Sequence, residues 1–151
     1  MRDHERYMGI ALELAREAAL DGETPVGCIV VDPEGAVIGR GRNRREKGRD
    51  ATAHAEIAAI AAACKEAGDW RLGGCSVYVT LEPCPMCAGA IMMSRISEVF
   101  YGAKDERTGS CGSVVNLFME PYGAETRITG GLLAGECAEL ISEFFSNLRD
   151  D

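Results

Sequence analysis

Two short motifs constrain this 151-residue chain most strongly, because together they supply the ligands of a metal site. Residues 54–56 read His-Ala-Glu, and residues 83–87 read Pro-Cys-Pro-Met-Cys. His54 offers an imidazole, while Cys84 and Cys87 offer two thiolates, and these are ligand types that Zn²⁺ prefers. Three protein ligands leave the fourth tetrahedral position for water, as in catalytic zinc sites. The two motifs are therefore expected to meet around one zinc ion per chain.

Glu56 lies two residues after the expected ligand His54, but the metal does not need its carboxylate as a ligand. Water held by zinc can ionise near neutral pH, and a carboxylate within reach can carry its protons. The sequence therefore predicts that Glu56 is the catalytic residue that transfers protons.

Both motifs are expected at helix N-termini. Residues 85–93 begin with proline, which suits the first turn of a helix, and continue as an apolar run. Cys84 and Cys87 then lie one turn apart on one face. The alanine-rich stretch 55–67 predicts a second helix, which places His54 at its start. A helix N-terminus favours thiolate over thiol, so this arrangement suits metal binding.

Each part of the pattern has a more ordinary explanation when taken alone. A Cys-x-x-Cys pair is often a redox pair or half of a structural zinc site, and a lone histidine is usually a structural polar residue. A structural site would need a fourth ligand, for which Cys28 or Cys111 could fold nearby. The only other histidine, His4, is expected to lie in a frayed terminus. The joint pattern favours a catalytic zinc site over these alternatives.

Length and cysteine content indicate one zinc-dependent domain over residues 1–151 in a reducing compartment. The seven cysteines are an odd number, which excludes a complete intramolecular disulfide framework. Those outside the zinc motif lie mostly among apolar residues and are expected to be free, buried thiols, which fits a cytoplasmic location. No apolar run is long enough to span a bilayer and no signal peptide is recognisable, so no membrane partner is expected.

The net charge of −8 argues against a generally basic nucleic-acid binder, but the charges are unevenly distributed. Residues 40–49 hold six arginines and lysines, immediately before the His54 segment. This basic stretch is either a solvated loop or a phosphate-binding rim beside the active site.

Hydrophobic periodicity and turn residues predict strands that alternate with helices. The expected helices cover residues 3–20, 55–67, 85–93 and 134–148. The expected strands cover residues 25–31, 36–43, 75–80, 98–101 and 127–129, and a glycine-rich loop covers 102–113. This alternation predicts an α/β domain in layers around a central sheet.

Short motifs spread over the chain carry a resemblance to a known family. They are Pro-Val-Gly (25–27), Gly-Arg-Asn-Arg (41–44), Thr-Ala-His-Ala-Glu (52–56), Tyr-Val-Thr-Leu-Glu-Pro-Cys-Pro-Met-Cys-Ala-Gly-Ala (78–90), Ser-Arg-Ile (94–96), Tyr-Gly-Ala-Lys-Asp (101–105), Gly109, Gly-Ser (112–113) and Phe-Phe (144–145). On these residues the chain, from about Tyr7 to Leu148, resembles bacterial tRNA-specific adenosine deaminases of the cytidine-deaminase superfamily. The zinc motif alone indicates the superfamily. The loop 102–113 and the tail indicate the tRNA-acting branch.

The resemblance implies a three-layer α/β/α sandwich with a mixed central sheet, a cytidine-deaminase-like fold, and a homodimer. It implies hydrolysis of adenosine to inosine at the wobble position of a tRNA anticodon, in an arginine tRNA, with the anticodon arm as the bound partner. It also implies that His54, Cys84 and Cys87 bind zinc, and that Glu56 is the proton shuttle.

The resemblance further assigns substrate contacts, each of which has an alternative explanation. Asn43 would hydrogen-bond the flipped base, although it could be a turn residue, and Ala55 would offer a backbone contact. Asp105 and Arg107 would touch neighbouring nucleotides, although Asp105 could only organise its loop. Phe145 would line the RNA path, although it or the preceding phenylalanine is expected to belong to the core.

Two departures from the family remove RNA contacts. The chain reads Arg-Asp-Asp at 149–151, where family members commonly carry a Lys/Arg-rich extension, and Gly-Ala-Glu at 123–125, where they often show Asn-His. An alternative function is therefore a small-molecule deaminase acting on guanine, cytosine or dCMP. A second alternative, of another class, is a zinc-stabilised binding module without chemistry.

Overall fold

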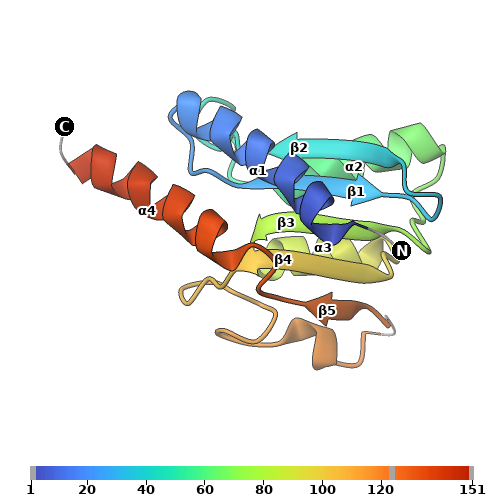
Figure 1. Ribbon diagram of the computed structural model, residues 1–151. Helices are drawn as coiled ribbons and strands as arrows, with labels where there is room; N and C mark the ends of the chain where they lie inside the picture. Colours follow the sequence, from blue (N-terminus) through green and yellow to red (C-terminus); the bar gives the residue numbers. More distant parts are fainter. Residues whose placement is uncertain (1–2, 123–124, 150–151) are drawn as a thin grey trace.

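A five-stranded mixed sheet forms the centre of the computed structural model, which describes residues 3–122 and 125–149. The strands lie in the order β2-β1-β3-β4-β5 (Figure 1). Their bounds are Gly27–Val31 (β1), Val37–Arg42 (β2), Ser76–Leu81 (β3), Glu98–Ala103 (β4) and Arg127–Thr129 (β5). The strand β1 pairs antiparallel with β2 and β3, whereas β3, β4 and β5 are parallel. The prediction of an α/β fold with a mixed central sheet is confirmed.

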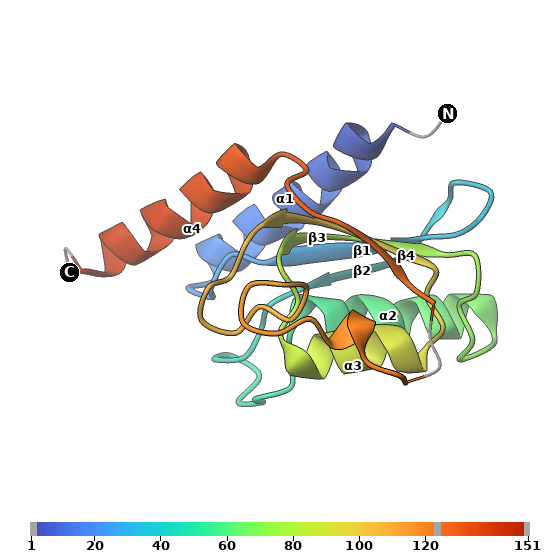
Figure 2. The same cartoon turned by 90° about the horizontal axis from the view of Figure 1, so that it is seen from below.

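Helices cover both faces of the sheet and give the molecule three layers. Figure 2 shows α1 and α4 on one face and α2 and α3 on the other. The bounds are His4–Leu20 (α1), Ala55–Ala67 (α2), Pro85–Met93 (α3) and Ala134–Arg149 (α4), with a short 3₁₀ helix at Leu117–Met119 (η1). This is the three-layer α/β/α sandwich implied by the resemblance. No helix within residues 3–122 and 125–149 is long and apolar enough to cross a membrane.

The strand directions bring the ends of four strands together on one side of the sheet. The pairing of Gly27 with Arg42 places the start of β1 beside the end of β2. The pairing of Leu81 with Ala103 places the ends of β3 and β4 together. Because β1 runs antiparallel to β3, the start of β1 lies beside the ends of β2, β3 and β4. Open α/β sheets bind their ligands beyond the carboxyl ends of such strands.

The central strands are buried on both faces, which explains their apolar sequences. Val77 and Val79 of β3 face the core beneath α2 and α3. Tyr78, between them, faces the core beneath α1, with Tyr7, Met8 and Leu12 of that helix in the same cluster. Val77 and Val79 therefore lie on one side of their strand, and Tyr78 lies on the other.

Two glycines let α2 lie directly on β2. A Cβ atom added at Gly39 would lie 2.2 Å from the carbonyl oxygen of Ala59, and one added at Gly41 would lie 2.2 Å from that of Ala55. Real Cβ atoms do not come so close, so only glycine permits this contact. The close packing fixes the N-terminal end of α2 against the end of β2, on the side of the sheet where these strand ends meet.

The structure corrects several details. Strand β1 begins at Gly27 rather than at residue 25, β4 continues to Ala103 and so includes the start of the expected loop, and η1 was not predicted. His4 is not frayed: it begins α1, its Nδ1 lies 2.7 Å from the Tyr78 hydroxyl oxygen, and its ring stacks on Phe100 at 4.3 Å. The departures at 123–124 and 150–151 lie outside the described residues.

Candidate active site

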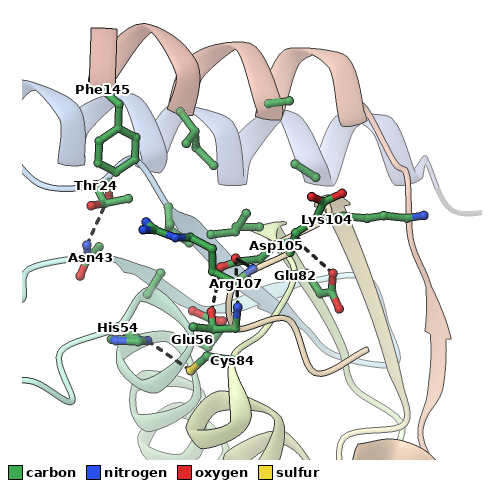
Figure 3. Close-up of a pocket in the computed structure, with 18 of the residues that line it drawn as sticks. Thr24, Asn43, His54, Glu56, Glu82, Cys84, Lys104, Asp105, Arg107 and Phe145 are labelled. Carbon is green, nitrogen blue, oxygen red and sulfur yellow. Dashed lines mark hydrogen bonds between the residues drawn. The ribbon is translucent and has the colours of Figure 1, made fainter. Parts of the chain in front are cut away.

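The two sequence motifs meet at the N-termini of α2 and α3. His54 is the N-cap residue of α2, and Cys84 is the N-cap residue of α3, with Pro85 in its first turn. The Nδ1 atom of His54 lies 3.6 Å from the Cys84 sulfur and 3.5 Å from the Cys87 sulfur (Figure 3 shows His54 and Cys84). The predicted placement of these ligands at helix starts is confirmed.

The three donor atoms fit a zinc ion. The nitrogen and the two sulfurs all lie within 4.8 Å of one another. Around a tetrahedral zinc with normal Zn–N and Zn–S bonds, neighbouring ligand atoms are about 3.5 Å apart. This is the one such cluster of histidine, cysteine and acidic side chains in the described part of the chain, and neither Cys28 nor Cys111 belongs to it. The donor set is therefore that of a site with three protein ligands, as expected for catalysis.

The cluster favours a thiolate before any metal is considered. Hydrogen bonds from Cys87 and from His54 lower the pKa of Cys84 to about 4. The bond with Cys84 raises the pKa of His54, and the pKa of Cys87 is raised by its hydrogen bond with Cys84 and by burial. Zinc binds thiolate rather than thiol, so the lowered pKa of Cys84 suits a metal ligand.

Glu56 lies beside this cluster without belonging to it. Its side chain lies in the first turn of α2 and is only 4% exposed, and burial is the main cause that raises its pKa to about 7. A general acid–base group works best when its pKa lies near the operating pH. The geometry and the pKa both suit a residue that accepts and returns protons.

A cavity of about 480 Å³ opens over Glu56 and two of the metal ligands, His54 and Cys84. This volume lies within the range of small-molecule sites and can admit a nucleobase. Its walls come from the end of β2, the starts of α2 and α3, the loop after β4, and α4. All of the substrate contacts implied by the resemblance line this one cavity: Asn43, Ala55, Asp105, Arg107 and Phe145.

Asn43 is both a turn residue and part of the cavity wall. Its side-chain N–H donates to the carbonyl of Thr24 at 3.3 Å, and its side-chain oxygen accepts from the N–H of Arg45 at 3.2 Å. The two bonds fix the amide plane, so the side chain faces the cavity in a set orientation (Figure 3).

Asp105 holds the conformation of its own loop. Its carboxylate accepts from the backbone N–H groups of Arg107 at 3.0 Å and Thr108 at 3.2 Å, and from the Thr108 hydroxyl at 2.9 Å. The structure thus shows the loop-organising role, and an RNA contact by Asp105 stays a prediction.

The expectation that Phe144 or Phe145 belongs to the core is wrong. Phe144 is half-buried and Phe145 is exposed, and their rings meet edge to face at 5.3 Å. Phe145 points from α4 toward Thr24 at the mouth of the cavity (Figure 3). The α4 helix therefore presents an aromatic ring where a substrate would enter.

The basic stretch 40–49 is partly neutralised. Asp21, at the end of α1, forms ion pairs with Arg42 at 2.7 Å and with Lys47 at 3.2 Å. Arg44 and Arg45 are exposed, and Arg45 lines the cavity. Only part of the predicted rim is therefore well placed for phosphates.

Sequence reasoning missed one buried carboxylate in the cavity wall. Glu82 precedes the Pro-Cys-Pro-Met-Cys motif and is only 2% exposed. Burial alone would raise its pKa, but hydrogen bonds from Ser113 and from backbone N–H groups outweigh it and lower the pKa. The sequence signal that was available is a glutamate between an apolar strand and a metal motif, but the hydrogen-bond partners of Glu82 lie more than 20 residues away in the chain.

Comparisons with known proteins find tRNA-modifying enzymes among the chain's relatives. The tRNA-specific adenosine deaminase of Bacillus subtilis is 43% identical over 150 residues, covering 99% of this chain and 92% of that protein. A tRNA(Ile)-lysidine synthase of Deinococcus deserti is 46% identical over 142 residues, but the chain spans only 27% of its length.

Among solved structures, one from studies of A-to-I editing by tRNA:A34 deaminases has a TM-score of 0.85 and 43% identity, covering 89% of this chain and 98% of that chain. The guanine deaminase from Nitrosomonas europaea has a TM-score of 0.83 and 27% identity, covering 95% and 85%. The family model for the cytidine and deoxycytidylate deaminase zinc-binding region matches residues 1–103, which include all three metal ligands. The chain therefore belongs to the cytidine and deoxycytidylate deaminase family of zinc-binding enzymes.

Proposed function

We propose that this protein hydrolyses adenosine to inosine at the wobble position of a tRNA anticodon, with an arginine tRNA as the expected substrate. The observation that carries the reaction is the placement of the buried Glu56 beside a three-ligand metal cluster at the floor of a nucleobase-sized cavity. The choice of tRNA is supported by near-full-length similarity to proteins named tRNA-specific adenosine deaminases. Release of ammonia from tRNA, measured beside free guanine, cytosine and dCMP, tests the choice.

His54, Cys84 and Cys87 would hold one zinc ion per chain. When bound, zinc lowers the pKa of water and so supplies a nucleophile near neutral pH. Glu56 takes a proton from the attacking water and gives it to the ring nitrogen next to C6 of adenine. It then carries a second proton to the departing amino group, so water adds and ammonia leaves.

The base must leave its stack to reach the floor of the cavity. A single-stranded loop is cheaper to open than a duplex, which favours an anticodon loop as substrate. Asn43 would orient the flipped base with an amide that Thr24 and Arg45 already fix, and Ala55 would add a backbone contact. Prior fixation reduces the entropy that binding must overcome.

Neighbouring nucleotides would lie along the cavity walls formed by the loop after β4 and by α4. Arg107 and Asp105, on the loop after β4, would contact the nucleotides beside the flipped base. Phe145 would stack on a base or sugar at the mouth, because exposed aromatic rings commonly bind single-stranded nucleic acid in this way.

Replacing Arg44 and Arg45 by alanine is expected to weaken binding of an anticodon stem-loop and to flatten its salt dependence. The net charge of −8 repels RNA at long range, so binding needs cations beside the cavity. Each lost phosphate contact lowers the slope of log K against log salt by roughly 0.7 for a single strand. Binding measured across a salt series gives both slopes.

The matched control is Arg71→Ala with Arg127→Ala, which removes the same charge elsewhere. Arg71 follows the C-terminal end of α2. Arg127 lies beside Glu98 at the starts of β5 and β4, whereas the cavity lies at the opposite end of the strands. The control should shift binding through net charge but keep the wild-type slope. Equal slopes for wild type and Arg44→Ala/Arg45→Ala would remove these arginines from the account.

We infer that two copies of the chain associate through an apolar patch on the outer side of α3 and η1. The patch consists of exposed residues from the end of α3 and from the segment between β4 and β5 that contains η1: Met93, Val114, Val115, Met119 and Tyr122. Met93 is 70% exposed and Met119 is 81% exposed, and α3 contacts η1, so the residues lie on neighbouring elements. Contiguous exposed apolar surface commonly marks an interface, and identical copies usually pair with two-fold symmetry.

Substitution of Met119 by glutamate is expected to convert a two-chain particle into a single chain, because it buries a charge in the proposed interface. Light scattering during size-exclusion chromatography measures the mass. Leu20→Glu is the control, since Leu20 is 89% exposed at the end of α1 and lies outside the patch. A wild-type mass of one chain, or an unchanged mass for Met119→Glu, would contradict the proposal.

A second candidate function is deamination of free guanine. It is favoured by the fold similarity to the guanine deaminase from Nitrosomonas europaea and by the protein's acidic charge. A cytoplasmic location is supported for either function by the seven cysteines, none of which forms a disulfide within the described residues.

A further inference from the structure

We infer that Glu82 is a positioning residue that fixes the loop 105–113 relative to the metal ligands, and that it acts on the substrate through Arg107. The inference deepens the proposed function and rests on it, because Arg107 matters only if the substrate extends beyond one base. Glu82 touches neither the metal cluster nor any reacting atom of the proposed chemistry. Its carboxylate instead accepts hydrogen bonds from the loop 105–113, through three backbone N–H groups and the Ser113 hydroxyl.

The Glu82 carboxylate receives four hydrogen bonds from that loop. One oxygen accepts from the N–H of Asp105 at 3.1 Å and from the Ser113 hydroxyl. The other accepts from the N–H groups of Cys111 at 2.9 Å and Ser113 at 3.1 Å. A single buried carboxylate thus binds the loop near both of its ends, and charge-assisted bonds of this kind are the strong ones.

Glu82 is itself held close to the metal ligands. It stands between the end of β3 and Cys84, and its own N–H donates to the carbonyl of Ala103 at 2.8 Å. The loop returns to the same segment, because the N–H of Ser110 donates to the carbonyl of Pro83 at 2.9 Å. These hydrogen bonds therefore fix the position of the loop relative to the backbone that carries the zinc ligand Cys84.

Gly109 allows this close approach. A Cβ atom added at Gly109 would lie 2.4 Å from the carboxyl carbon of Glu82 and 2.4 Å from the carbonyl oxygen of Asp105. No larger residue fits without moving the loop, so the glycine and the glutamate form one unit.

The four hydrogen bonds of Glu82 form a clamp on the loop, and this clamp acts on Arg107 through Asp105. Glu82 fixes the N–H of Asp105, and the Asp105 carboxylate in turn accepts from the N–H of Arg107 at 3.0 Å. Both Glu82 and Arg107 line the cavity, whose wall this loop forms (Figure 3). Loss of the clamp would let the loop shift and carry Arg107 away from the nucleotide beside the flipped base.

Glu82→Gln is expected to raise KM for an anticodon stem-loop about tenfold to a hundredfold, while kcat changes less than about threefold. The amide places N–H groups against N–H donors of the loop, so the clamp loosens although the side chain keeps its size. A misplaced positioning group can cost about a hundredfold even when the chemistry is intact, and loss of binding alone appears in KM. Zinc content should stay at one per chain.

The decisive measurement is a double-mutant cycle with Arg107→Ala. If Glu82 acts through Arg107, then Glu82→Gln should raise KM less than about threefold further in the Arg107→Ala background. Glu23→Gln is the matched control, because Glu23 is 1% exposed and clamps a different loop through the N–H groups of Glu46 and Lys47. Its effect should be the same in both backgrounds.

Additive effects of Glu82→Gln and Arg107→Ala would overturn the inference, as would a fall in kcat with unchanged KM. If Glu82→Gln does not fold, judged by zinc content and cooperative melting, Ser113→Ala takes its place in the cycle. It removes only the hydroxyl donor to Glu82 and should show a smaller rise in KM with the same coupling. Absence of inosine with the wild-type protein would instead reject the proposed function, so the two failures are distinguishable.

Discussion

Glu56→Ala is expected to retain one zinc per chain and the native fold but to lose most of its turnover. Glu56 is buried beside the metal cluster without being a member of it, so its removal leaves all three ligands in place. General acid–base groups contribute about 10²–10⁴ in rate, and a residue that makes two proton transfers should contribute at the upper end or beyond. The substitution also removes a buried carboxylate, so stability should not fall for electrostatic reasons.

Single-turnover deamination and metal analysis of the same sample measure both halves of this prediction. Glu66→Ala is the control, because Glu66 is an exposed carboxylate near the other end of the same helix. It should leave rate and zinc unchanged. Substantial residual deamination by Glu56→Ala, or zinc loss as large as that of a ligand variant, would show that Glu56 does not have the assigned role.

Cys87→Ala is expected to lose both the zinc and the activity. Cys87 is completely buried, and its sulfur lies 3.5 Å from the His54 nitrogen in the cluster. With one ligand gone, only His54 and Cys84 remain, and metal binding that stabilises the folded state is lost with it. The melting temperature should therefore fall toward that of the chelator-treated wild type, and added zinc should not restore it.

Cys64→Ala provides the comparison for this variant. Cys64 is a partly exposed thiol in the last turns of α2, outside the metal cluster. Its substitution should leave zinc content and turnover near wild type. Full zinc occupancy in Cys87→Ala would mean that another residue completes the site, and the three-ligand account would then be wrong.

The features that sequence could predict are those with local causes. Pro85 and the apolar run after it specify the start of α3, and the alanines after His54 specify α2. Correct helix boundaries placed each ligand at or near a helix start, and the ligand types of the two motifs predicted that they meet around one metal ion. The strands followed from short apolar runs between turn residues, which depend only on neighbours in the chain.

The features that sequence could not predict depend on contacts between distant residues. Asp21 forms ion pairs with Arg42 and Lys47 of the basic stretch, although it lies about 20 residues or more before them in the chain, at the C-terminal end of α1. The 2.7 Å contact of His4 with Tyr78 joins residues from opposite halves of the chain. Local periodicity carries no information about such pairs, and a one-dimensional count of charges therefore overstated the basic rim.

The central claim is tested most directly by the product formed in tRNA. Purified zinc-loaded protein is incubated with unmodified tRNA, the RNA is digested, and inosine is located by mass spectrometry of the fragments, with free guanine assayed in parallel. The account predicts inosine at the anticodon wobble position, far less inosine with Glu56→Ala, and little ammonia from guanine. Efficient release of ammonia from guanine with no inosine in any tRNA would contradict it.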